Sequence, residues 1–89
     1  MSLYVAAYDI SRDSARRHVA NVLLSYGRRV QLSVFEIDLD PEDLPDLKRS
    51  VGPWLAVTDQ FDLFPVDRRR PEQRVRWQRP PYPEPVQLF

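Results

Sequence analysis

Residues 3–11, LYVAAYDIS, form a continuous apolar run that ends in a carboxylate at Asp9. An uninterrupted run of this kind is typical of a strand that is buried on both faces. An ionised carboxylate is costly to remove from water unless it is paired, hydrogen-bonded or bound to a metal. Asp9 therefore either marks the point where the strand reaches water or belongs to a binding site.

The residues that follow predict a helix over about residues 12–26. Ser11 is placed to cap its N-terminus, apolar residues follow at helical spacing, and Gly27 fits the position just beyond its C-terminus. Arginine near a helix N-terminus opposes the helix dipole, which is easier to understand if an anion binds nearby. Three arginines lie on or near the first turns: Arg12, Arg16 and Arg17.

Further along, residues 29–31, 33–39 and 60–66 are rich in apolar and β-branched residues and are interpreted as strands, the last ending near Pro65. Residues 54–58 are interpreted as a link or another strand. Between them, Asp40-Pro41 gives a capping residue and a first-turn proline for a second helix, which ends at Gly52-Pro53. Pro45 lies beyond the first turn and predicts a kink or a late helix start.

The order strand, helix, strand, strand, helix, strand predicts an α+β fold. A ferredoxin-like β-α-β-β-α-β sandwich satisfies it, with two helices on one face of a four-stranded antiparallel sheet. We assign this domain to residues 1–66. Residues 67–89 are rich in proline and arginine and are interpreted as an arm, in which Val75-Arg76-Trp77 pairs with the sheet edge of a second protomer; a loose tail is the alternative.

Size and composition narrow the classes of protein. A chain of 89 residues buries a limited core, so a dimer is a reasonable expectation. The absence of cysteine excludes disulfides and thiolate metal sites and suits a cytoplasmic protein. No apolar run approaches the length of a membrane span, and no signal peptide is recognisable, so no membrane association is expected.

The formal net charge is zero, but the charges are segregated along the chain. Residues 36–46 hold six acids and no base, whereas residues 67–79 hold six arginines and two acids. Lys48 is the only lysine, and arginine suits phosphate recognition better than lysine does. A neutral total can therefore conceal a basic surface that binds nucleic acid; a set of solvated charges is the alternative.

Several motifs, in this order and spacing, resemble the CRISPR-associated Cas2 family. They are the strand-terminal Tyr8-Asp9-Ile10, the Arg16-Arg17 pair, RRVQLSVFE at 28–36, DPED at 40–43 and FDLFPV at 61–66. The resemblance covers about residues 3–66. It implies a homodimer in which Asp9 of the two protomers meets across a two-fold axis and holds Mg²⁺ or another hard divalent cation such as Mn²⁺. Facing carboxylates would otherwise repel each other.

The resemblance also implies a role in antiviral defence, in the acquisition of CRISPR spacers. The chain would be a metal-dependent endonuclease on RNA or double-stranded DNA, a scaffold that bridges the Cas1 integrase and duplex DNA, or both. Asp9 would be the catalytic and metal-binding residue. By similarity, Arg16, Arg17 and Arg29 would contact nucleic acid, and Tyr8, Ser11 and Phe35 would be neighbours of the site.

Each of these residues also has a plain structural interpretation. Tyr8 and Phe35 suit core packing, Ser11 suits a helix cap, the arginines suit a solvated face, and Glu36 is expected to pair with an arginine. Because a fold alone does not fix function, a toxin-like ribonuclease or a small regulatory module of the same fold is the alternative to a CRISPR role.

Overall fold

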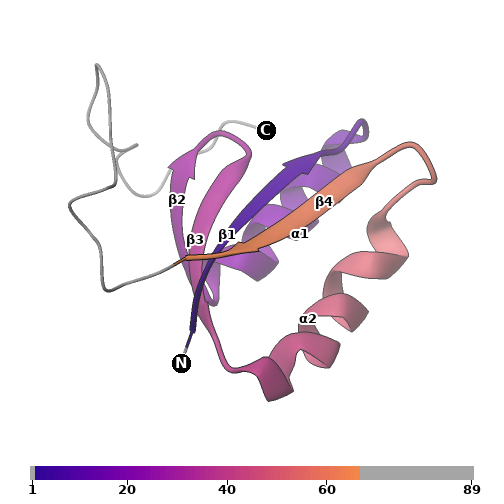
Figure 1. Ribbon diagram of the computed structural model, residues 1–89. Helices are drawn as coiled ribbons and strands as arrows, with labels where there is room; N and C mark the ends of the chain where they lie inside the picture. The colour runs from indigo at the N-terminus through magenta and orange to yellow at the C-terminus, as the bar shows by residue number, and fades with distance from the viewer. Residues whose placement is uncertain (1, 67–89) are drawn as a thin grey trace.

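The computed structural model describes residues 2–66. They form a four-stranded antiparallel sheet with both α-helices on one face (Figure 1). The arm predicted over 67–89, with its strand at Val75-Arg76-Trp77, lies outside the described residues. The elements are β1 (Ser2–Asp9), α1 (Asp13–Leu24), β2 (Gly27–Gln31), β3 (Val34–Leu39), η1 (Pro41–Asp43), α2 (Leu44–Val51), η2 (Gly52–Trp54) and β4 (Gln60–Pro65), where η marks a 3₁₀ turn.

The strands lie in the order β2-β3-β1-β4, and every neighbouring pair is antiparallel. β1 is central, paired with β3 on one side and with β4 on the other. The prediction that it is buried on both faces is wrong, because Leu3, Val5 and Ala7, which alternate with the buried Ala6 and Tyr8, are only partly buried. This order is that of a ferredoxin-like sandwich, so the predicted α+β fold is confirmed.

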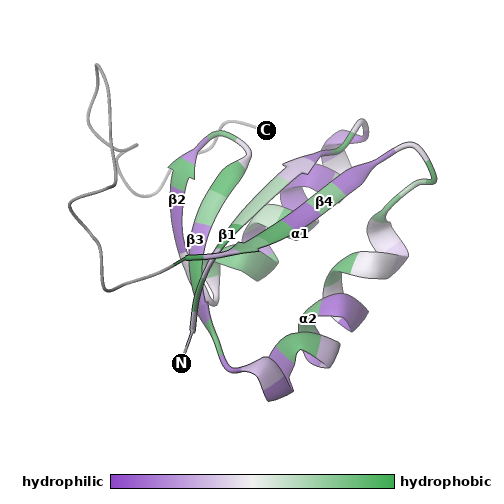
Figure 2. Ribbon diagram, viewed as in Figure 1, coloured by the Kyte–Doolittle hydropathy of each residue, from purple (hydrophilic) through white to green (hydrophobic). Residues whose placement is uncertain are grey.

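The core lies between the sheet and the two helices. Side chains alternate along β1, so Ala6 and Tyr8 face the helices while Ala7 and Asp9 face the opposite side, which we call the open face. Hydrophilic and hydrophobic residues also alternate along β4 (Figure 2). The largest fully buried side chains are those of Phe35, Leu23, Ile37, Leu39, Leu47 and Val19.

The ends of α1 differ from those predicted. The N-cap is Arg12 and has no side-chain cap bond, so Ser11 is not the cap. The C-cap is Ser25, and Gly27 begins β2 instead of ending the helix. Glycine is required there because a Cβ on Gly27 would lie 1.9 Å from the carbonyl oxygen of Glu36 on the neighbouring strand.

The late start predicted for the second helix is confirmed. The 3₁₀ turn η1 precedes it, and α2 begins at Leu44, which places Pro45 in the first turn, where its missing N–H costs little. Asp40 precedes η1 without a side-chain cap bond. Residues 54–58 form no strand: Trp54 ends η2, and the residues after it lead through a turn to β4.

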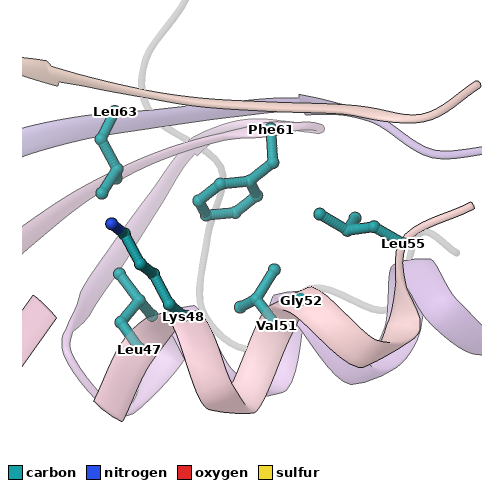
Figure 3. Close-up of a pocket in the computed structure, with 7 residues that line it drawn as sticks. All are labelled: Leu47, Lys48, Val51, Gly52, Leu55, Phe61 and Leu63. Carbon is teal, nitrogen blue, oxygen red and sulfur yellow. The ribbon is translucent and has the colours of Figure 1, made fainter. Parts of the chain in front are cut away.

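The C-terminal end of α2 and the turn after it are joined to α1 through His18. The His18 ring on α1 stacks on Trp54 at a centroid distance of 4.1 Å and bonds the carbonyl oxygen of Ser50 at 2.9 Å. Between α2 and β4 is an apolar hollow of about 290 Å³, into which Phe61 and Leu63 point from the strand (Figure 3).

No helix within residues 2–66 is long and apolar enough to span a membrane.

Candidate metal and nucleic-acid site

Asp9 is the last residue of β1, and its side chain is exposed on the open face. Its partner in the ladder is Gln60, the first residue of β4, and Ala7 pairs with Asp62 in the same ladder. Because side chains alternate along strands, Ala7, Asp9, Gln60 and Asp62 all belong to this face. The sheet register thus brings two carboxylates and an amide to one end of two neighbouring strands.

These side chains surround a hollow of about 200 Å³, lined by Ala7, Tyr8, Asp9, Gln60 and Asp62. Carboxylate and amide oxygens are the donors that Mg²⁺ and similar hard cations prefer. Within residues 2–66, however, no group of three or more acidic, histidine or cysteine side chains is placed to hold a metal. The donors among residues 2–66 therefore fit a hard divalent cation in kind, and the rest of its coordination would come from outside this set.

Tyr8 lies on the opposite face, behind Asp9, in an aromatic cluster. Its ring is stacked between Phe35 at 6.2 Å and Phe61 at 6.4 Å, measured between ring centroids. Burial raises the pKa of Tyr8, and the nearby Arg29 guanidinium, which also forms a hydrogen bond with the phenol, offsets part of this rise. The cluster fixes the residue that precedes Asp9.

The structure changes the interpretation of Arg29. Only 2% of this residue is exposed, and its guanidinium carbon lies 5.1 Å from the centroid of the Phe35 ring, in a cation–π contact. A side chain buried in this way does not present its guanidinium to a phosphate, so the surroundings of Arg29 do not favour the nucleic-acid contact, which stays a prediction. Arg29 and Phe35 instead support Tyr8 from within the fold.

Arg16 and Arg17, adjacent in sequence, have different surroundings. Arg16 Nη1 donates hydrogen bonds to the carbonyl oxygens of Ile10, at 2.8 Å, and Ser11, at 2.7 Å, and its Nη2 pairs with Asp13. Its guanidinium is therefore committed to the loop after Asp9. Arg17 is exposed, so of the three arginines predicted to contact nucleic acid it is the one whose surroundings suit that role.

Comparison with known proteins gives the family. The model of the CRISPR associated protein Cas2 family matches residues 1–74. This chain belongs to the Cas2 family. It is 49% identical over 65 residues to the CRISPR-associated endonuclease Cas2 2 of Thermus thermophilus, covering 72% of each chain. It is 35% identical over 86 residues to the CRISPR-associated endoribonuclease Cas2 3 of Synechocystis sp., covering 96% of this chain and 94% of the relative.

A solved structure described as a partial Cas6-RT-Cas1–Cas2 complex contains a chain of the same fold. Its TM-score is 0.71 at 21% identity, with 86% of this chain and 91% of the other covered. The predicted membership of the Cas2 family is thus confirmed. Cas2 relatives of this chain carry the names of nucleases, and a fold neighbour is found with Cas1.

The sequence patterns did not single out three residues near Asp9. Gln60 and Asp62 lie in β4, and Asp59 directly precedes that strand. Gln60 and Asp62 alternate along β4, which the period of two in QFDLFPV could have indicated. Their position beside Asp9 depends on the register between β1 and β4, strands separated by fifty residues, and no local pattern encodes that register.

Proposed function

We propose that this Cas2-family chain acts as a homodimeric, metal-dependent endonuclease, in which Asp9 of the two copies holds Mg²⁺ or Mn²⁺. The observation that carries the proposal is the exposed Asp9 carboxylate beside a hollow to which residues 2–66 bring oxygen donors, but too few of them to complete a metal site. A two-fold axis would bring identical residues together and supply the second carboxylate.

The open face supports pairing of two copies. Phe64, which is 53% exposed, lies on it opposite Val5 in the β1–β4 ladder, four residues along the strand from Gln60. An exposed aromatic side chain on a sheet face gains most when a second apolar surface covers it. A dimer formed through this face would bury Phe64 and bring the two Asp9 side chains to the same interface.

The residues of the chain have distinct parts in such a site. A divalent ion, when bound, would supply stabilisation of the negative charge that develops on a phosphodiester during cleavage. Asp9 would bind that ion, the packing of Tyr8 against Phe35 would fix the strand end, and Arg17 would attract the phosphate backbone of RNA or double-stranded DNA.

A scaffolding role in spacer acquisition, in which the dimer bridges the Cas1 integrase and duplex DNA, is the second candidate. It is favoured by the sparse acid–base chemistry of the site, because the described residues that line the hollow include no histidine or lysine, and the groups that could transfer a proton are limited to Tyr8, Asp62 and Asp9 itself. We further propose that residues 1–66 are the folded domain and that the arm, residues 67–89, associates with the partner protomer. The six arginines of the arm against its three acids suit the acidic segment 36–46.

The test is cleavage of labelled single-stranded RNA and duplex DNA by the wild type and by Asp9→Ala, each with Mg²⁺ and with a chelator. Cleavage that requires both Asp9 and the metal, with the variant still a folded dimer, supports the nuclease. Equal cleavage by the wild type and the variant rejects Asp9 as the catalytic residue. Absence of cleavage with duplex and Cas1 binding intact rejects the nuclease and leaves the scaffold.

A further inference from the structure

The loop that follows Asp9 is held by side chains from two directions. Arg16 donates to the carbonyl oxygens of Ile10 and Ser11, at 2.8 and 2.7 Å. From the β4 side, Asp59 Oδ1 accepts the backbone N–H of Ser11 at 3.2 Å. The peptide groups that link Ile10 to Ser11 and Ser11 to Arg12 are therefore fixed, although these residues belong to neither a helix nor a strand.

Asp59 is itself fixed by the turn that leads into β4. Its backbone N–H donates to the carbonyl oxygen of Ala56 at 3.0 Å, and its Oδ2 accepts the N–H of Ala56 at 2.8 Å. The carboxylate thus joins two loops, the one that leaves β1 and the one that enters β4. A carboxylate that accepts N–H donors on both oxygens makes charge-assisted bonds, which are stronger than neutral ones.

The position of Asp59 relative to Asp9 gives this bond its significance. Asp9 and Gln60 form the last pair of the β1–β4 ladder, and Asp59 directly precedes Gln60. The last pair of a ladder is the one most prone to opening, because nothing beyond it holds the two strands together. The bond from Ser11 to Asp59 closes the ladder beyond that pair, next to the strand end where Asp9 lies exposed.

We propose that Asp59 is a positioning residue for metal binding at Asp9, an inference that rests on the proposed function. Asp59 does not line the hollow and is not a ligand. It holds the β1–α1 loop against the start of β4, so that the Asp9 carboxylate keeps its position beside Gln60 and Asp62. Metal sites lose about 10- to 100-fold in affinity when a group that orients a ligand is removed.

The experiment measures Mn²⁺ binding by calorimetry on the full-length protein. It compares the wild type with Asp59→Ala, Asp9→Asn and, as a control, Asp46→Ala. Asp46 is also an exposed carboxylate, but it lies on α2, where it pairs with Arg49, so its removal changes the net charge equally without touching the loop. Amide hydrogen exchange of Ser11 and of the core residue Ala6 is followed in the same samples.

Asp59→Ala is expected to bind Mn²⁺ about tenfold more weakly than Asp46→Ala. It should also speed exchange at Ser11 while leaving Ala6 protected. Equal Mn²⁺ affinity in Asp59→Ala and Asp46→Ala, in a wild type whose binding Asp9→Asn abolishes, overturns the inference and leaves the proposed function standing. Mn²⁺ binding that Asp9→Asn does not change, or no binding at all, overturns the proposed metal site and the inference with it.

If Asp59→Ala loses protection at Ala6 as well, the fold itself has opened. Asp59→Asn then carries the comparison, because it keeps the shape of the side chain but retains only one acceptor oxygen for two N–H donors. It should show weaker Mn²⁺ binding in the same direction with Ala6 still protected. Unchanged Mn²⁺ affinity in Asp59→Asn, with faster exchange at Ser11, overturns the inference, because the loop would then be loosened without consequence for the metal.

Discussion

Arg28 donates two hydrogen bonds to a single carboxylate oxygen of Glu36, from Nε at 3.1 Å and from Nη2 at 2.8 Å. The two residues are directly opposite each other in the β2–β3 ladder. The Glu36 side chain is only 8% exposed, whereas that of Arg28 is 56% exposed. A carboxylate that is nearly buried thus takes two of its hydrogen bonds from a guanidinium that is still largely in water.

Arg28→Met is therefore expected to lower the free energy of unfolding. It removes two donors from a buried charged acceptor, a loss of about 1–3 kcal/mol. Urea denaturation at a fixed protein concentration measures the change, because association of copies would otherwise alter the apparent stability. The matched control is Arg49→Met, which breaks the exposed Arg49–Asp46 pair on α2 and should cost less than about 0.5 kcal/mol. Equal effects of the two substitutions would contradict this account of Glu36.

Gly27→Ala is expected to be strongly destabilising, although it adds only a methyl group. The new Cβ would lie 1.9 Å from the Glu36 carbonyl oxygen and 2.7 Å from the Ile37 Cα, both backbone atoms that can move only with the strand. Overpacking of this kind costs about 1–3 kcal/mol. Thermal or urea unfolding would measure the loss.

Gly52→Ala is the control for this substitution, because a Cβ at Gly52 would meet nothing within 4 Å apart from its chain neighbours. It should cost clearly less than Gly27→Ala, because the lower entropy of the unfolded chain offsets the crowding of the new Cβ against the ring of Pro53. A similar loss in both variants would show that strand contact at Gly27 is not the cause.

The sequence predicts the individual helices and strands well, but it predicts poorly which residues of different strands come together. The strand that ends at Asp9 and the late helix start at Pro45 follow from local patterns, and the structure confirms both, although it does not bury both faces of that strand. Arg29 illustrates the limit: an arginine within RRVQLSVFE is expected in water, but the strand period turns it inward onto Phe35. Asp62 illustrates it at the site, because only the register of β4 against β1 brings it near Asp9.

The stability conferred by Tyr8 is expected to depend on pH. Burial raises the pKa of the Tyr8 phenol above its ordinary value of about 10. As pH rises through about 10, the unfolded chain ionises at Tyr8 before the folded protein does. This releases protons on unfolding, so the contribution of Tyr8 to stability is complete below pH 10 and is lost above it.

The comparison of wild type with Tyr8→Phe isolates this effect from other groups that titrate at high pH. From about pH 7 to 9 the variant should be less stable by about 1 kcal/mol, because it lacks the hydrogen bond with Arg29. Above pH 10 the difference should shrink, by at most about 1.4 kcal/mol per pH unit. Urea denaturation across this range measures it. A difference that stays constant to pH 11 would show that the phenol is not buried in solution.

Duplex DNA binding distinguishes Arg17, which is exposed on α1, from Arg29, which is buried against Phe35. Each phosphate that an arginine neutralises contributes about 0.9 to the slope of log affinity against log salt concentration. Arg17→Ala should therefore lower that slope by about this amount and leave the free energy of unfolding nearly unchanged. Arg29→Met should lower the free energy of unfolding and leave the slope as it is. Fluorescence anisotropy of labelled duplex DNA between 50 and 300 mM salt measures the slope, because this range of about sixfold resolves a change of one unit. Urea denaturation measures the free energy of unfolding. The contrary outcome is a folded Arg29→Met protein whose slope falls by as much as that of Arg17→Ala. The Arg29 side chain would then have to leave the core to contact a phosphate, and the fold around Phe35 would have to open when the protein binds nucleic acid.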